Sequence, residues 1–281
     1  MSIDLAEFKT LALRRDDGVL HVTLNRPDVR NAMSMTMVRE LRVVLAQAEM
    51  RCCTHDNTRV IVLRGAGGHF CAGADLSDMA AARMRLQDDP TALVKTNAAF
   101  GELCVAYADT GIATVAVVEG SCMGGGFGLA CVADVTLATD TASFRLPETS
   151  LGLVPAQIGP FLVERLGYAE AKRLAVTGGR LGAQEALALR LVHAVHAADA
   201  IDAALTLVLS GILQCAPGAM AATKALIAKA RFQSPASLVQ AAAEVFSRAA
   251  LGPEGVEGTT AFLQKRKAAW VPGPPSAVAP L

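Results

Sequence analysis

The stretch Glu119-Gly-Ser-Cys-Met-Gly-Gly-Gly-Phe-Gly-Leu129 follows a strand-like apolar run, Thr114–Val118, and its glycines open an apolar helix. Glycines let the backbone approach a ligand closely, and the first turn of a helix offers unpaired N–H groups with a partial positive charge. A second stretch, His69-Phe-Cys-Ala-Gly-Ala-Asp-Leu76, follows the run Arg59–Arg64 and the turn Gly65–Gly68. Two such loops facing each other would hold one oxyanion between two backbone amides, although either loop alone is more simply explained as a tight turn.

Strand-like and helix-like segments alternate outward from these loops. Polar and apolar residues alternate over residues 18–25, which predicts a half-buried strand, and residues 133–139 form another strand-like run. Ser34 can cap a helix over residues 34–50, and residues 91–109 have the pattern of a second helix. Strands that alternate with helices indicate an α/β fold with βα units and a largely parallel sheet.

The pattern changes after about His196, where strand-like runs cease. Three later segments have helical periodicity: 220–231, 237–251 and 255–270. The sequence therefore predicts a first domain over residues 1–197, a helical domain over residues 198–272 and a flexible tail over residues 273–281.

Composition and charge exclude several classes of protein. The chain has 281 residues, with 26 Lys and Arg against 26 Asp and Glu, so its formal net charge is zero. This balance argues against a nucleic-acid or anionic-membrane partner, since both require clustered positive charge. The longest apolar stretch, Ala203–Leu213, is too short to span a membrane, and residues 1–9 do not resemble a signal peptide. These features predict a soluble cytoplasmic protein.

The cysteine and histidine positions indicate no metal site. Among the seven cysteines, only Cys52 and Cys53 are close neighbours, and no group has the spacing of zinc ligands. Four cysteines lie in apolar surroundings that are typical of buried, unreactive thiols: Cys71, Cys104, Cys122 and Cys131.

Five motifs in chain order resemble those of the crotonase (enoyl-CoA hydratase/isomerase) superfamily, and the resemblance covers nearly the whole chain. The motifs are Leu24-Asn-Arg-Pro27 with Asn31-Ala32, Phe70-Cys-Ala-Gly-Ala-Asp75, Gly124-Gly-Gly126, Phe144-Arg-Leu-Pro-Glu148 with Leu151-Gly-Leu-Val-Pro155, and Ala261-Phe-Leu-Gln-Lys-Arg-Lys267. The resemblance implies a ββα spiral core of the α/β class, a C-terminal helical trimerisation domain and an acyl-CoA substrate. It also implies a homotrimer or a dimer of trimers. No cofactor is implied, because coenzyme A enters as part of the substrate.

The resemblance also implies roles for particular residues. It assigns the two oxyanion amides to Ala74 and Gly125 and the acid/base role to Glu148. In such a site, losing one oxyanion donor typically costs about 3–4 kcal/mol of transition-state stabilisation. The residues that would contact substrate or CoA are Arg30, Ala72, Gly73, Asp75, Leu76, Gly124, Phe246, Phe262 and Lys265. Phe262 and Lys265 are candidates to act from a neighbouring subunit.

The sequence departs from the family pattern at Gly128, where short-chain hydratases have a first catalytic glutamate. Gly128 would leave space there or a site for water, and Glu148 is then the one acid/base in register. A general base works best when its surroundings raise its pKa toward the operating pH. The apolar residues expected to do this by desolvating Glu148 are Leu146, Leu151, Leu153 and Val154.

One glutamate can support two reactions. It can move a proton between C2 and C4 of an enoyl thioester, which is isomerisation, or activate water for addition at C3, which is hydration. The segment Glu148–Ile158 resembles that of hydratases acting on 3-methylglutaconyl-CoA or isohexenylglutaconyl-CoA, substrates of leucine and acyclic terpene catabolism. The prediction is therefore a hydratase. An isomerase using Glu148 alone is the first alternative, and a non-catalytic or RNA-binding scaffold is the second.

A glutaconyl-type substrate carries a second carboxylate, which requires a cation or N–H donors in the acyl pocket. Arg83, Arg85 and Lys95 are the candidate cations, although each is also typical of a solvated helix face. Gln157 could orient water, bind the carboxylate or simply cap the next helix. Five methionines are candidates to line an adaptable pocket: Met33, Met35, Met37, Met79 and Met84.

Overall fold

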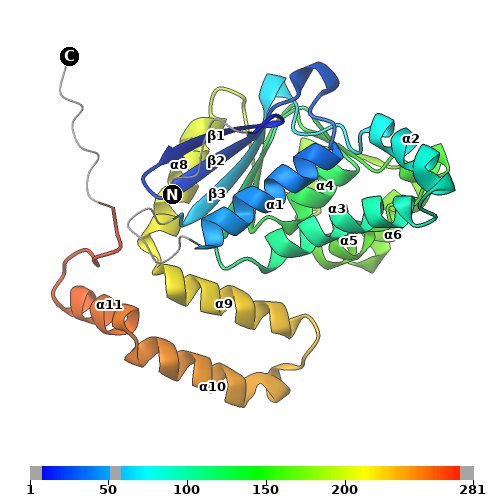
Figure 1. Cartoon of the computed structure of the whole chain (residues 1–281). Coiled ribbons are helices and arrows are strands. Elements are labelled where there is room, and N and C mark those ends of the chain that lie inside the picture. Colours follow the sequence, from blue (N-terminus) through cyan, green and yellow to red (C-terminus); the bar gives the residue numbers. More distant parts are fainter. Residues whose placement is uncertain (1–7, 51–57, 273–281) are drawn as a thin grey trace.

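The computed structural model describes residues 8–50 and 58–272, and its core is a six-stranded sheet (Figure 1). In spatial order its strands are β1 (Leu11–Asp16), β2 (Val19–Leu24), β3 (Val60–Gly65), β4 (Ala113–Val118), β6 (Val135–Thr139) and β9 (Ala194–His196). β1 and β2 are antiparallel and every other pair is parallel, which confirms the largely parallel sheet. β1 was not predicted, because half of this edge strand is exposed and its side chains include three charges.

A second, three-stranded sheet gives the core its repeated ββα form. Its strands are β5 (Ser121–Met123), β7 (Ser143–Arg145) and β8 (Arg180–Gly182). β4 is followed by β5, and β6 by β7, while β3 is followed by Cys71, which pairs with Cys122 of β5 as an isolated bridge. β3, β4 and β6 thus each lead into a short extended piece of the second sheet and then into a helix, so the predicted ββα spiral is confirmed.

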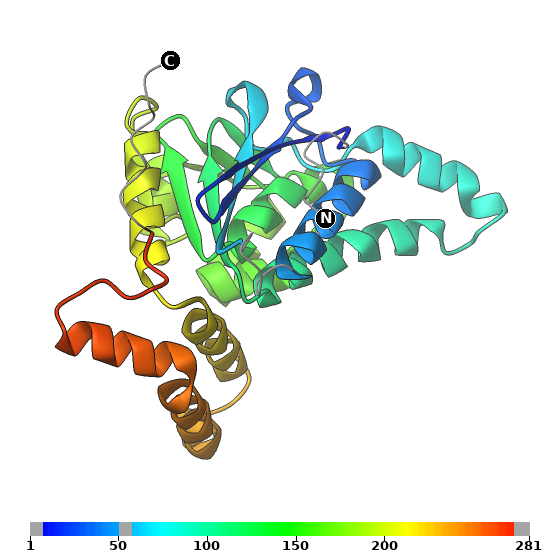
Figure 2. The same ribbon diagram turned by 60° about the vertical axis from the view of Figure 1, so that its left-hand side comes forward.

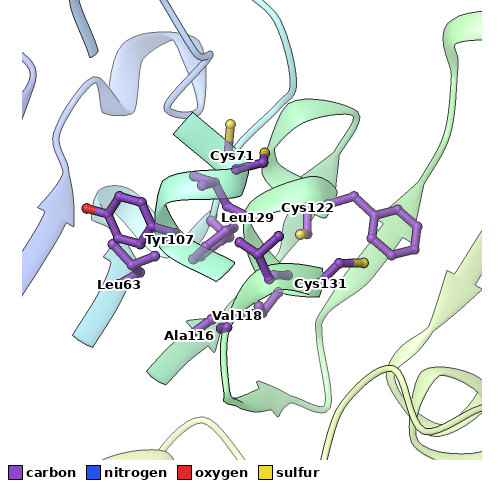
Figure 3. Close-up of a cluster of buried hydrophobic side chains, with 14 of the residues drawn as sticks. Leu63, Cys71, Tyr107, Ala116, Val118, Cys122, Leu129 and Cys131 are labelled. Atoms are coloured by element: carbon purple, nitrogen blue, oxygen red, sulfur yellow. The ribbon is translucent and has the colours of Figure 1, made fainter. Parts of the chain in front are cut away.

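Helices cover both faces of the six-stranded sheet. One face packs against α1 (Met35–Met50), α3 (Ala92–Asp109) and α4 (Gly125–Val132), and the other against α8 (Ile201–Gln214). Figure 3 shows Cys71, Cys122 and Cys131 of the first face among aliphatic and aromatic side chains, including Leu129 and Tyr107. Burial raises the pKa of Cys71 to about 11 and that of Cys131 to about 12, as expected for unreactive thiols. Cys52 and Cys53 lie outside the described residues.

The remaining helices complete the core and form a separate arm. In the core they are α2 (Leu76–Met84), α5 (Gly159–Leu166), α6 (Tyr168–Thr177) and α7 (Ala183–Ala188), and in the arm α9 (Pro217–Ala230), α10 (Pro235–Leu251) and α11 (Pro253–Leu263). α2 was missed because Ala82 is its one buried residue, so it has little apolar pattern. The arm, residues 217–263, extends away from the sheet (Figures 1 and 2).

The C-terminal helix is shorter than predicted. α11 ends at Leu263 rather than near residue 270, and Lys265 has a positive φ of 54° that a helix does not accommodate. The chain then returns to the core, where the Trp270 indole donates a hydrogen bond to the Gln214 carbonyl at 2.9 Å. α8 falls within the predicted helical segment 198–272 but packs on the sheet through Ile201 and Leu205, which are buried. The predicted tail 273–281 lies outside the described residues.

No single helix in the described ranges is both long and apolar enough to cross a membrane. Only α8 and α9 taken together reach that length and composition, and they are bent by 98° relative to each other.

Candidate active site

A cavity of about 390 Å³ lies where successive turns of the spiral enter their helices. Its walls are mainly apolar and come from α2, α3, the two glycine loops and the segment that begins at Glu148. The apolar side chains include Met33, Met35, Met79, Leu93, Phe100, Leu151, Leu153, Val154 and Ile158. The polar ones include Asp75, Arg83, Asn97, Glu148 and Gln157. A largely apolar cavity with few polar groups is typical of a small-molecule site.

Strand register brings three functional groups to one place. The residues that pair side by side in the second sheet are Cys71, Cys122 and Phe144. Ala74 and Gly125 each follow their paired residue by three positions, and Glu148 follows its own by four. Parallel strands in register carry corresponding positions to the same edge, so groups from three distant parts of the chain meet at the cavity.

The Ala74 amide is held by a short parallel bridge to Met33. The Met33 amide donates to the Gly73 carbonyl at 2.7 Å, and the Asp75 amide donates to the Met33 carbonyl at 3.0 Å. The Ala74 N–H lies between these bonded groups, and no described residue accepts a hydrogen bond from it. Gly73 has a φ of 94°, which the turn requires and which favours glycine.

The second amide stands at the N-terminus of α4. Gly124 has φ 47° and ψ −115°, and its amide donates to the Arg145 carbonyl at 3.0 Å. The next amide, that of Gly125, has no acceptor among the described residues. A methyl group added to Gly124 would lie 3.6 Å from the Gly73 Cα, so the two loops touch. Two amides without acceptors therefore line one cavity from adjacent loops.

Glu148 begins the 3₁₀ turn Glu148–Leu151 and borders the second loop. A methyl group added to Gly124 would come within 2.7 Å of the Glu148 Oε1 atom. The other oxygen, Oε2, is buried and has no hydrogen-bond partner among the described residues. Burial raises the pKa of Glu148, and a hydrogen bond with its own backbone offsets this only in part. This confirms the predicted direction and is the condition a general base near neutral pH requires.

The space expected beside Gly128 is filled. A methyl group on Gly128 would lie 2.4 Å from the Ile158 Cγ2 atom and 3.5 Å from the Phe100 ring. Gly128 is buried and does not line the cavity, so the prediction of an open space or water site at this position is wrong. Ile158 reaches this position because the segment after Glu148 folds back onto α4.

The predicted substrate-contact residues divide into two groups. Those that line the cavity are Ala72, Gly73, Asp75, Leu76, Gly124 and Gln157. Arg30, Phe246, Phe262 and Lys265 do not line it within one chain. The Arg30 carbonyl nevertheless accepts from the Ala72 amide at 2.9 Å, and Phe262 is 83% exposed.

Only one of the three candidate cations reaches the cavity. Arg83, on α2, lines it, and no described residue forms an ion pair or hydrogen bond with its guanidinium. Arg85 and Lys95 instead line a separate cavity of about 190 Å³, where Lys95 binds Asp89 at 2.8 Å. Of the five candidate methionines, Met33, Met35 and Met79 line the main cavity. Met37 is wholly buried in the core, which is the ordinary role of an apolar side chain, and Met84 is exposed, so neither lines the cavity.

Two residues of the site escaped the sequence analysis. The side-chain amide of Gln157 donates through its Nε2 atom to the Asn97 Oδ1 atom at 2.8 Å, and both residues line the cavity. Asn97 lies in α3, where the sequence does not distinguish a polar residue that lines a cavity from one that faces solvent. Arg26 pairs with Asp75 at 2.7 Å. Its signal was the Asn-Arg-Pro motif, whose arginine had been assigned no role.

Within residues 8–50 and 58–272, no group of three or more His, Cys, Asp or Glu side chains could hold a metal ion.

Comparison with known proteins identifies the family to which the chain belongs. Residues 14–272 match the model of the enoyl-CoA hydratase/isomerase family, and the chain belongs to this family. This confirms the crotonase superfamily and makes the protein a lyase or an isomerase.

Particular relatives have both kinds of activity in their names. The structure of Pseudomonas aeruginosa AtuE is similar with a TM-score of 0.89 and 49% identity, over 94% of this chain and 100% of that one. The enoyl-CoA hydratase AFT6-1 of Alternaria alternata is 32% identical over 89% of this chain and 80% of its own length. The peroxisomal Delta(3,5)-Delta(2,4)-dienoyl-CoA isomerase of Arabidopsis thaliana is 29% identical over 94% of this chain and 97% of its own length.

Proposed function

We propose that this protein is a hydratase that adds water across the 2,3 double bond of an enoyl-CoA thioester. The observation that carries the proposal is the unpartnered, buried Oε2 atom of Glu148 beside two amides without acceptors, those of Ala74 and Gly125. A carboxylate that needs a polar partner suits a bound water molecule. Two free amides suit an oxygen that gains negative charge.

The two amides and Glu148 have separate tasks in the reaction. The thioester oxygen accepts hydrogen bonds from the Ala74 and Gly125 amides, which stabilise the enolate as it forms. Ionised Glu148 takes a proton from water while the water oxygen bonds to C3 and the C2–C3 π electrons move toward the thioester. Protonated Glu148 then delivers that proton to C2, so the enzyme ends unchanged and water has been added. This chemistry requires no cofactor besides the CoA of the substrate.

The acyl group we propose is a branched glutaconyl type, such as 3-methylglutaconyl or isohexenylglutaconyl. Its second carboxylate needs a cation, and Arg83 lines the cavity with no described partner. The Asn97–Gln157 pair adds amide N–H groups at the same cavity. The apolar wall, with three methionines, suits a branched hydrocarbon chain.

An isomerase is the second candidate, because Glu148 is the one carboxyl lining the cavity that has a buried oxygen without a partner among the described residues. The two aspartates of the lining, Asp75 and Asp78, already accept hydrogen bonds. Ile158 fills the position beside Gly128, so a second acid does not approach from α4. In both reactions one glutamate acts first as base and then as acid. In hydration it takes the proton from water and delivers it to C2, whereas in isomerisation it moves a proton between C2 and C4 and no water is added.

Mass spectrometry of purified protein with a panel of acyl-CoAs separates these proposals. The panel contains crotonyl-CoA, 3-methylglutaconyl-CoA, isohexenylglutaconyl-CoA and a 3-enoyl-CoA. A gain of one water, lost in Glu148→Gln, supports the hydratase. An unchanged mass with a moved double bond supports the isomerase, and no change with any member of the panel contradicts both.

We expect Arg83→Ala to raise KM for 3-methylglutaconyl-CoA by about 10- to 100-fold, because a charge-assisted contact with a carboxylate contributes about 1.5–3 kcal/mol. KM for crotonyl-CoA, which lacks that carboxylate, should change less than about twofold. Arg85→Ala is the matched control, since Arg85 lies outside the cavity lining. Equal losses on both substrates, or equal losses in both variants, would contradict the assignment.

We also propose that the arm forms the interface of a homotrimer or a dimer of trimers. Large apolar side chains are exposed along the arm in one chain, namely Ile227, Phe232, Val239, Phe246, Leu251, Val256, Phe262 and Leu263. Sedimentation should give a mass three or six times that of one chain, and Leu251→Glu should lower it. Val94→Glu, at an exposed site on α3 outside the arm, is the control. A monomeric wild type would contradict this proposal.

A further inference from the structure

We propose that Arg26 is a positioning residue whose guanidinium holds the Ala74 amide in place for the oxyanion. The inference rests on the proposed function, because it concerns one of the two amides assigned there. Arg26 does not line the cavity, so any effect it has on the reaction must pass through the residues it holds.

The contacts of Arg26 enclose the segment that carries the amide. Its Nη1 atom donates to the Asp75 carboxylate at 2.7 Å and to the Ala32 carbonyl at 2.7 Å. Asp75 follows Ala74, and Ala32 precedes Met33, the backbone partner of Ala74 in the isolated bridge. One nitrogen atom therefore joins the two short segments that form the bridge, 31–33 and 73–75.

Arg26 is itself fixed at its backbone. Its amide donates to the Asn31 Oδ1 atom at 2.9 Å, and its carbonyl accepts from the Asn31 amide at 2.8 Å. Asn31 is wholly buried, and its Nδ2 atom donates to the carbonyls of Ala66 and His69 at 2.8 and 2.7 Å. The guanidinium thus extends from a rigid base, so it can restrain Asp75 rather than follow it.

The Arg26–Asp75 pair is well placed to act as such a restraint. The side chains are 26% and 13% exposed, and the carboxylate also accepts from the Ser77 amide and hydroxyl at 3.0 and 2.6 Å. Burial acts to raise the pKa of Asp75, but the hydrogen bonds from Ser77 and Arg26 outweigh it and lower the pKa. Asp75 therefore stays ionised at neutral pH, and charge-assisted hydrogen bonds of this kind are stronger than neutral ones.

Placement of the amide has a direct catalytic consequence. An oxyanion donor is effective when it is preorganised about 2.7–3.1 Å from the developing charge. A misplacement of about 1 Å can cost about 100-fold in rate. The hydrogen bonds of the bridge to Met33 join backbone groups and do not involve the Arg26 side chain, so we expect a smaller loss than for removing the donor itself.

The test compares Arg26→Met, Arg26→Lys and the control Arg42→Met. Arg42 makes a surface ion pair with Glu102 at 2.6 Å and does not line the cavity. We expect kcat to fall about tenfold in Arg26→Met, with KM changed less than about threefold, because the donor acts mainly on the transition state. Arg26→Lys should recover part of kcat, since an ammonium can still reach Asp75. Arg42→Met should match the wild type.

A second readout reports the hydrogen bonds directly. Butyryl-CoA labelled with ¹³C at the thioester carbon cannot be hydrated, and its carbonyl stretch moves to lower frequency when oxyanion donors bind the oxygen. The shift should be smaller in Arg26→Met than in the wild type. Combining Arg26→Met with Asp75→Asn should add little to either single change, because both break one pair.

These measurements distinguish the positioning role of Arg26 from the assignment of the two oxyanion amides. If Arg26→Met has the same carbonyl shift and the same kcat as the wild type and differs from it only in a lower melting temperature, the positioning role is overturned. Absence of a shift in the wild type would instead overturn the assignment of the amides. If Arg26→Met does not fold, Asp75→Asn decides the matter, because it weakens the same pair while keeping an acceptor oxygen for Ser77.

Discussion

Replacing Glu148 with glutamine should lower kcat about 1000-fold or more while the protein remains folded. General acid–base catalysis contributes about 10²- to 10⁴-fold, and this carboxyl is proposed to act twice in each turnover. Glutamine has nearly the same shape, so the cavity and the two amides should keep their positions. Turnover is measured together with the melting temperature. Glu102→Gln, at an exposed ion pair on α3, is the control and should retain full activity.

The pH dependence tests the same residue. Because burial raises its pKa, Glu148 should become an effective base only as pH rises through a value above 4.5. Between pH 4.5 and this raised pKa, Glu148 keeps its proton in the folded protein but has released it in the unfolded chain. Its stability should therefore fall as pH rises from 4.5 through the raised pKa. Glu148→Gln should remove this part of the stability profile, and an unchanged profile would contradict the desolvated state of the carboxyl.

Replacing Gly124 with alanine should abolish most activity and also destabilise the fold. Gly124 has φ 47° and ψ −115°, a conformation that costs an L residue about 1–3 kcal/mol. The added methyl would also meet the Glu148 Oε1 atom at 2.7 Å. Relief of either strain moves the Gly125 amide or the carboxyl, so kcat should fall about 100-fold or more, as for loss of an oxyanion donor.

Gly211→Ala is the control for this substitution. Gly211 lies in α8, has no positive φ, and a methyl group there meets nothing within 4 Å. Alanine should stabilise that helix by about 0.5–1 kcal/mol and leave kcat unchanged. Chemical unfolding and steady-state kinetics of both variants measure the difference. Wild-type kcat in Gly124→Ala would mean that this backbone conformation does not place the second amide.

Much of the fold was open to prediction because its signals are local. Alternation over residues 18–25 and apolar stripes over 34–50 and 91–109 depend on neighbours one to four positions away, and β2, α1 and α3 follow them closely. Sequence patterns failed where packing is not local. α2 buries almost nothing, and the chain after Leu263 turns back to the core through contacts such as Trp270 with Gln214.

The candidate site shows the same division. Glu148 and the amides of Ala74 and Gly125 were identified from motifs, and the structure places all three at one cavity. Which residues surround them was not predictable from spacing. Ile158 fills the position next to Gly128, and Arg83 rather than Arg85 lines the cavity, because these outcomes depend on how the segments 148–158 and 76–84 fold over α3 and α4.

The sequence by itself determined the family, the two glycine loops and the one glutamate, since these depend on residue types at fixed spacing. The tertiary structure alone decided which groups meet. Register between Cys71, Cys122 and Phe144 aligns three turns of the spiral. Burial then leaves the Glu148 Oε2 atom without a described partner. Desolvation and proximity are properties of the packed chain, and they bring separate motifs together as one candidate site.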